Sequence, residues 1–194
     1  FNALFAEMDE KLPWIDASRP VTQVHFGGGT PSAVPYSFLE KILNKLRERF
    51  TFAPHAEIAI ECNPSLIDEP RLRELAQMGF NRVSYGIQDF DPQVLKNVGR
   101  DPSILPVKEL LTLSRELNFT GINLDLIYGL PSQTEAAFYK SVELAAEAHP
   151  DRIALFSYAH VPWVKKAQKA LEKFPLPTPH EKLGFFLEAR DMFK

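Results

Sequence analysis

The stretch that decides the fold is Val21–Ser32, with the sequence VTQVHFGGGTPS. It joins a short strand-like run to three glycines that lead toward an amphipathic helix. The same order of strand and helix repeats along the chain. Strands are predicted at Val21–Phe26, Glu57–Glu61, Arg82–Gln88, Gly121–Tyr128 and Arg152–Tyr158, and helices at Phe1–Leu12, Tyr36–Phe50, Asp68–Met78, Ser103–Leu117, Gln133–His149 and Thr178–Phe193. These repeats predict a single α/β domain with a parallel sheet and right-handed crossovers.

The predicted strands differ in character between their two faces. One face is apolar, with Val24, Phe26, Ile58, Ile60, Val83, Tyr85, Ile87, Ile122, Leu124 and Leu126. The other is polar or small, with Gln23, His25, Glu57, Ala59, Glu61, Ser84, Gly86, Gln88, Asn123 and Asp125. A doubly wound sheet would bury these carboxylates against helices, which costs several kcal/mol each if they are unpaired. The pattern therefore favours a barrel that encloses a polar cavity.

Polar residues also gather where the predicted strands end. They are Gly27–Thr30 after the first strand, Glu61, Gln88 and Asp125 near the ends of the next three, and Ala159–His160 after the fifth. Any one of them could simply cap a neighbouring loop. Because all five strands agree, and because barrels of this type build active sites at that rim, we predict a functional site there.

The glycine run Gly27–Gly29 leaves backbone N–H groups uncovered, so that the main chain could approach a small anionic or zwitterionic ligand. The spacing is neither that of the dinucleotide fingerprint nor that of a P-loop. A tight turn without a ligand is the alternative. The sequence leaves three roles open for Glu61: it could accept hydrogen bonds from ribose hydroxyls, act as a general base, or form a salt bridge to a lysine on a helix.

Three further residues carry reactive groups. Cys62 is predicted to be a small buried residue rather than a nucleophile. His25 is predicted to be a hydrogen-bonded interior histidine. His160 lies past a strand end, where it could bind a substrate carboxylate or play a structural role.

Composition excludes several classes of function. The chain has 194 residues, 45% hydrophobic and 24% charged, with a net charge of −3 that argues against a nucleic-acid or basic membrane-surface protein. No apolar run approaches the roughly 20 residues that span a bilayer. The single cysteine, Cys62, excludes an intrachain disulfide and a cysteine-ligated cluster within this stretch, and predicts a cytoplasmic location. Both ends lie within amphipathic segments, so we expect a fragment truncated at both ends.

Four motifs together resemble one family. They are His25–Pro31 (HFGGGTP), Ile60–Pro64 (IECNP), Gly86–Phe90 (GIQDF) and Asn123–Pro131 (NLDLIYGLP). The set is similar to the radical S-adenosylmethionine (SAM) enzymes and, among them, to the oxygen-independent coproporphyrinogen III oxidases. The run Asp125–Leu130 is shared with haem-chaperone relatives, whereas Gln88–Phe90 and Tyr158–Pro162 favour the oxidase branch.

The resemblance implies a partial (β/α)6 TIM-like barrel, with residues 1–194 as a radical SAM core domain that lacks the first strand and its C-x-x-x-C-x-x-C loop. It implies S-adenosylmethionine and a 4Fe–4S cluster as cofactors, with the cluster cysteines upstream of Phe1, so that this chain alone is inactive. The implied reaction is oxidative decarboxylation of coproporphyrinogen III propionates to vinyl groups, giving protoporphyrinogen IX in anaerobic haem biosynthesis. The alternative is a haem chaperone on the same scaffold.

Residue by residue, Gly28 matches the family position at the cluster-bound S-adenosylmethionine, and Glu61 matches the one at its ribose. Positions around a second S-adenosylmethionine are matched by Gly29, Thr30, Gln88, Arg100, Asp125 and Ala159. No catalytic residue is assigned. Cys62–Asn63 and Ser157 depart from the family pattern without removing a ligand. The expected partners are a porphyrinogen substrate and an electron donor that the sequence does not identify, with no nucleic acid or membrane, and the expected state is a monomer.

Overall fold

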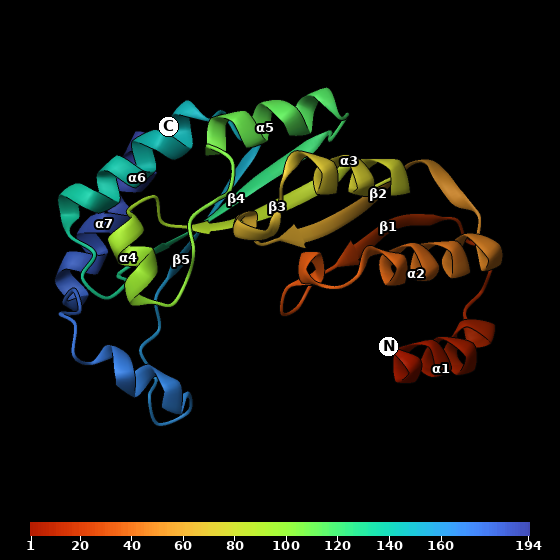
Figure 1. Ribbon diagram of the computed structural model, residues 1–194, viewed down its shortest axis with the longest axis horizontal. Coiled ribbons are helices and arrows are strands. Elements are labelled where there is room, and N and C mark those ends of the chain that lie inside the picture. Colours follow the sequence, from red (N-terminus) through yellow and green to blue (C-terminus); the bar gives the residue numbers. More distant parts are fainter.

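The computed structural model describes residues 1–194 and contains one sheet of five parallel strands in the order β1-β2-β3-β4-β5. The strands are β1 Val21–Phe26, β2 Phe52–Cys62, β3 Arg82–Gln88, β4 Gly121–Tyr128 and β5 Arg152–Ser157. The helices are α1 Asn2–Lys11, α2 Tyr36–Arg49, α3 Glu69–Met78, α4 Pro92–Asn97, α5 Val107–Glu116, α6 Glu135–Glu147 and α7 Pro179–Met192. Figure 1 shows the sheet curling, with α3, α5 and α6 along its outer side. Leu39 and Leu43 of α2 belong to the same buried cluster as the strand residues. The predicted partial barrel is confirmed as a half-barrel.

All five predicted strands and six predicted helices are present, with several ends shifted; helix α5, for example, begins at Val107 rather than at Ser103. Strand β2 begins at Phe52 rather than at Glu57. Helix α4 was not predicted, because six residues are too few for a periodic pattern; it begins where Asp91 Oδ1 accepts hydrogen bonds from the N–H groups of Gln93 and Val94.

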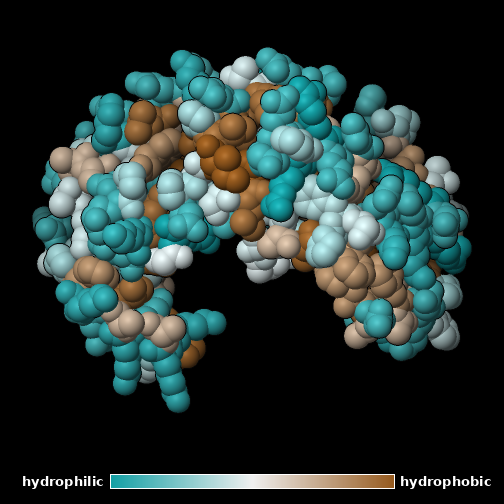
Figure 2. Space-filling view, viewed as in Figure 1, coloured by the Kyte–Doolittle hydropathy of each residue, from teal (hydrophilic) through white to brown (hydrophobic).

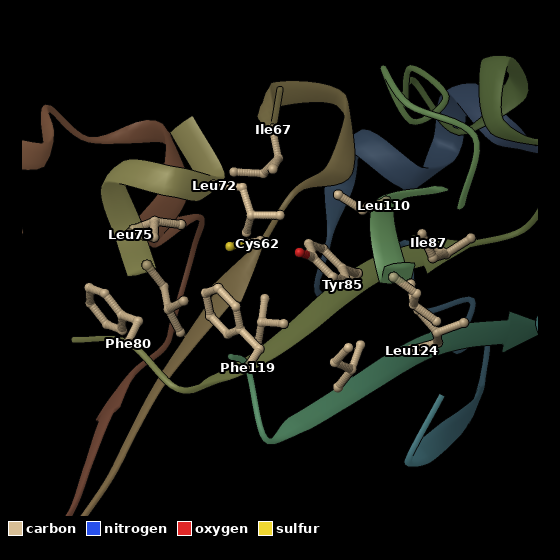
Figure 3. Close-up of a cluster of buried hydrophobic side chains, with 14 of the residues drawn as sticks. Cys62, Ile67, Leu72, Leu75, Phe80, Tyr85, Ile87, Leu110, Phe119 and Leu124 are labelled. Carbon is tan, nitrogen blue, oxygen red and sulfur yellow. The ribbon is translucent and has the colours of Figure 1, made fainter. Parts of the chain in front are cut away.

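The main hydrophobic core lies between the outer face of the sheet and the helices. It is a cluster of 21 buried residues, and the register pairs its members across strands, Val83 with Ile122 and Tyr85 with Leu124. Figure 3 shows Tyr85 and Leu124 among the leucines, isoleucines and phenylalanines of this cluster. Full burial of one such side chain contributes about 1.5–3 kcal/mol. The predicted apolar face is therefore confirmed as the core face of the sheet.

The inner face carries the polar residues, which pair with one another across the strands. Glu57 accepts hydrogen bonds from Gln23 Nε2 (2.6 Å) and from Arg82 Nη1 (3.0 Å). No helix covers this face, and Figure 2 shows the molecule as an arch around an open hollow. The Glu57 and Glu61 side chains are therefore 32% and 44% exposed, which the doubly wound alternative would not have allowed. No helix is both long and apolar enough to cross a membrane.

Candidate functional site

The glycine run after β1 is held in a conformation that favours glycine. Gly28 and Gly29 have φ of 82° and 62°, in the left-handed region, and a Cβ on either would meet no atom within 4 Å. A Cβ on Gly27 would lie 2.7 Å from His25 Nε2 and 2.8 Å from Glu61 Oε1. The loop therefore passes close over the His25–Glu61 pair while its next two residues face open space.

Glu61 joins this loop to the inner face of β2. Its Oε2 accepts a hydrogen bond from the Gly28 N–H at 3.2 Å, and its Oε1 lies 3.2 Å from His25 Nε2. Its partners are thus a backbone amide and a histidine, and the helix-lysine alternative is wrong. His25 is hydrogen-bonded as predicted, but its side chain is 53% exposed and not interior, because the inner face has no helix over it.

Asp125 on β4 is held from two sides. Its Oδ2 accepts from Ser84 Oγ at 3.0 Å, and its Oδ1 accepts from Asn123 Nδ2 at 2.7 Å. Burial raises the pKa of Asp125 above its ordinary value, the two donated hydrogen bonds oppose that rise, and the charge of Glu61 adds to it. The carboxylate is therefore fixed in direction and close enough to Glu61 to interact with it.

A bulge at the end of β3 turns Gln88 toward the same place. Tyr85 pairs with Leu124 and Gln88 with Leu126, so β3 has one residue more than β4 in this interval, and Gln88 has φ of 68°. A Cβ on Gly86 would lie 2.7 Å from Gln88 Nε2 and 3.6 Å from Arg100 Nη1. Gly86 thus makes room for the Gln88 side chain, whereas a Cβ would be in ordinary contact with Arg100. The side chain of Arg100 donates only to the Gly86 carbonyl, at 3.3 Å, and forms no ion pair.

These groups converge on a cavity of about 140 Å³. We call it the cofactor cavity, after the ligand that the sequence motifs predict there. Its lining is almost wholly polar: Gly29, Thr30, Glu61, Cys62, Asn63, Ser84, Gly86, Gln88, Arg100 and Asp125. Six of the eight predicted site residues line this cavity. A seventh, Gly28, donates a backbone hydrogen bond to Glu61, which is part of the lining. Ala159 does not line it; this residue lies after β5, where its carbonyl accepts a hydrogen bond from Gln168 Nε2 at 3.0 Å.

Four lining residues were not predicted as site residues: Cys62, Asn63, Ser84 and Gly86. Ser84 and Gly86 lie on the polar face of β3, in alternation with Gln88, so the period of the strand was the signal for them. Cys62 is 4% exposed, and burial raises the pKa of its thiol to about 12. A buried thiol that stays protonated matches the prediction of a small core residue rather than a nucleophile.

The family model of the Radical SAM superfamily matches residues 4–145 of this chain. The chain belongs to the Radical SAM superfamily. The oxygen-independent coproporphyrinogen III oxidase of Synechocystis is 43% identical over 88% of this Radical SAM chain and 37% of its own length. Those of Paracoccus denitrificans and Escherichia coli are 37% and 40% identical over 99% and 96% of the chain. The chain spans about two fifths of the length of these curated relatives.

The solved structure of coproporphyrinogen III oxidase from Escherichia coli, a Radical SAM enzyme, superimposes with a TM-score of 0.87. It is 39% identical and covers 96% of this chain and 43% of its own. The archaeal Elp3 of Methanocaldococcus infernus, at 16% identity and a TM-score of 0.61, shares the fold alone. The Radical SAM half-barrel is thus common to distant proteins, whereas the sequence likeness lies with the oxidases.

A second carboxylate of the Radical SAM chain lies behind the cofactor cavity. Asp89, next to Gln88, is 1% exposed and accepts hydrogen bonds from Ser141 Oγ (2.6 Å), Gln133 Nε2 (2.6 Å) and the Asp91 N–H (2.8 Å). Gln133 Oε1 in turn accepts from the Gly129 N–H at 2.6 Å. Asp89 thereby fastens the loop after β3 to the loop after β4 and to α6. Sequence reasoning gave Asp89 no role, because these contacts join distant segments.

His160 lies at the rim, as predicted, but apart from the cofactor cavity. Its Nε2 is 3.3 Å from Glu172 Oε1 and its Nδ1 is 3.4 Å from Tyr158 Oη. It lines a second cavity of about 440 Å³ between the ends of β4 and β5 and helix α7, together with Lys182. Because both ring nitrogens have partners within the chain, the structure favours the structural role of His160.

Proposed function

We propose that this chain is the core of a radical SAM oxidase that decarboxylates coproporphyrinogen III propionates to vinyl groups and yields protoporphyrinogen IX. The observation that carries the proposal is the 39% identity and TM-score of 0.87 to the coproporphyrinogen III oxidase of Escherichia coli over 96% of the chain. The motifs Gln88–Phe90 and Tyr158–Pro162 support the oxidase over the haem chaperone. We place the protein in the cytoplasm, as a monomer that receives electrons from a separate donor.

The cofactor cavity has the chemistry that S-adenosylmethionine requires. Open backbone at Gly28–Gly29 can approach the methionyl end, a half-exposed carboxylate at Glu61 can accept hydroxyl groups, and the guanidinium of Arg100 has no carboxylate partner in the chain. We propose that Gly28 and Glu61 hold one S-adenosylmethionine, and that Gly29, Thr30, Gln88, Arg100, Asp125 and Ala159 surround a second.

When bound to a 4Fe–4S cluster and reduced, S-adenosylmethionine supplies the radical chemistry that removes hydrogen from a propionate. The residues of this chain hold the groups that line the cavity in fixed positions. Ser84 and Asn123 hold the Asp125 carboxylate in one direction, and the buried Asp89 fixes the backbone from which Gln88 enters the cavity. Precise support of this kind is what a site needs when the cofactor carries the reaction.

The cluster ligands are proposed to lie on a segment that precedes this chain in the full-length protein. Within residues 1–194, no group of three or more His, Cys, Asp or Glu side chains could hold a metal ion, and Cys62 is buried and alone. The greater length of the curated relatives supports this division. We therefore propose that residues 1–194 form part of a radical SAM core domain and are inactive alone.

The test is an anaerobic assay of the full-length protein after iron–sulfur reconstitution, with S-adenosylmethionine, a reductant and coproporphyrinogen III. The proposal predicts 5′-deoxyadenosine and protoporphyrinogen together. Deoxyadenosine without a porphyrin product, in a protein that binds haem, would replace the oxidase by the chaperone. Neither product, in a protein with its cluster, would overturn the activity.

A further inference from the structure

The segment Val161–Phe174, which we call the lysine-rich segment, follows the rim end of β5. It contains Lys165, Lys166, Lys169 and Lys173 against the single acid Glu172, a net charge of 4 − 1 = +3 in a chain whose net charge is −3. Figure 1 shows it in blue beyond the end of β5, and in Figure 2 that part of the chain forms one side of the open hollow. Positive charge is thus concentrated beside the inner face.

This segment is attached to the rim by specific hydrogen bonds. Gln168 Oε1 accepts from the Val161 N–H at 2.6 Å, and Gln168 Nε2 donates to the Ala159 carbonyl at 3.0 Å. Glu172 lies 3.3 Å from His160 at its other end. The segment is therefore seated on Ala159, the one predicted site residue that does not line the cofactor cavity.

The lysines of the segment are free of ionic partners. All four are exposed, and none takes part in an ion pair or donates a side-chain hydrogen bond within the chain. Lys166 and Lys169 lie three apart in the 3-10 helix Lys166–Leu171, whose three residues per turn place them on one face. Trp163 and Val164, 75% and 65% exposed, add apolar surface next to them.

We propose that the lysine-rich segment binds the carboxylates of the tetrapyrrole substrate, with Trp163 against its apolar macrocycle. The proposal rests on the proposed function. An apolar ring with carboxylates at its rim complements a tryptophan flanked by unpaired lysines. A standard protein–protein interface takes roughly 20–30 residues from each partner, more than the 14 residues of this segment. The lysine-rich segment lies beside the open hollow, through which a small substrate would reach the inner face of the sheet.

The test uses the full-length protein with its cluster, and coproporphyrin III, a fluorescent and redox-stable probe with the same carboxylates. The variant Lys166→Gln/Lys169→Gln is compared with Lys41→Gln/Lys108→Gln, which removes two exposed lysines of α2 and α5 that form no ion pair. We expect the segment variant to weaken Kd about fivefold or more at low salt, and to reduce its salt dependence, with the control within twofold of wild type. Trp163→Ala should weaken Kd at low and high salt alike.

The outcomes separate this proposal from the proposed function. Unchanged Kd in both lysine variants, in an enzyme that turns over coproporphyrinogen III, would overturn the role of the segment and leave the function standing. A wild-type protein that turns over coproporphyrinogen III without binding the probe would overturn the role of the segment alone, and one that neither binds the probe nor forms product would overturn both. A rate that falls only with an acidic flavoprotein reductant, and not with dithionite, would assign the segment to the electron donor and also overturn the proposal.

Discussion

Asp125 lies on β4, Asp89 follows the end of the neighbouring strand β3, and the two carboxylates differ in what surrounds them. Burial raises the pKa of both. Asp89 is 1% exposed and accepts three hydrogen bonds within the chain, whereas Asp125 lines the cofactor cavity. A raised pKa alone does not distinguish a carboxylate that joins two loops from one that faces a ligand. What distinguishes them is whether the carboxylate lines the cavity. Substitutions behind the cavity should therefore reduce stability, and substitutions on it should reduce binding.

The largest expected effect on stability comes from Asp89→Asn. The new NH2 group would face the Gln133 amide or the Ser141 hydroxyl, both of which donate to Asp89. One buried donor would be left unpaired, which would lower the free energy of unfolding by about 2–3 kcal/mol. Chemical denaturation of the full-length protein measures this loss. Asp91→Asn is the matched control, because asparagine caps a helix as well as aspartate does. Equal stability of the two variants would contradict the fastening role of Asp89.

On the cavity side, Glu61→Gln should weaken S-adenosylmethionine binding about tenfold, a change of about 1.4 kcal/mol, while the free energy of unfolding stays close to that of wild type. Titration calorimetry of the full-length protein measures the affinity. Glu57→Gln, four residues earlier on the same face and outside the cavity, serves as the control and should bind normally. A loss of affinity shared by both variants would remove Glu61 from the proposed site.

Between these two regions lies Gly86. In Gly86→Ala the new Cβ would meet Gln88 Nε2 at 2.7 Å, so that Gln88 must leave its place in the cavity. We expect a severalfold loss of S-adenosylmethionine affinity with a smaller loss of stability than in Asp89→Asn. The control Gly184→Ala, in α7 with nothing within 4 Å of the new Cβ, should stabilise by about 0.5–1 kcal/mol. Normal affinity of Gly86→Ala would show that Gln88 does not contact the cofactor.

The smallest effect is a pH dependence at Asp125. Because its pKa is higher in the folded than in the unfolded chain, the folded state binds more protons between those two pKa values. Stability relative to the Asp125→Asn variant should therefore rise as the pH falls from neutral through the folded pKa, until the unfolded value is reached. Denaturation of both proteins at several pH values measures this. If the stability of wild type relative to Asp125→Asn instead fell on acidification, the pKa of Asp125 would be lowered in the folded chain.

The period of the strands explains why part of the cavity was predictable, whereas Arg100, which lies in a loop, entered the prediction only through the family resemblance. Alternation along β1 to β4 separated the core face from the polar face, and the polar residues nearest the strand ends, such as Glu61 and Gln88, reached the same cavity. The Asp89 network was not predictable in this way, because Gln133 and Ser141 are 44 and 52 residues away in sequence. The exposure of His25 also depends on which face the helices cover, and periodicity alone does not fix that.

The most direct test of the central claim is a crystal structure of the full-length protein grown anaerobically with S-adenosylmethionine. The account predicts density for the cofactor against the backbone of Gly28–Gly29, with the Glu61 carboxylate in contact with its hydroxyl groups. A cofactor bound elsewhere, with Glu61 still joined only to His25 and the Gly28 amide, would contradict it.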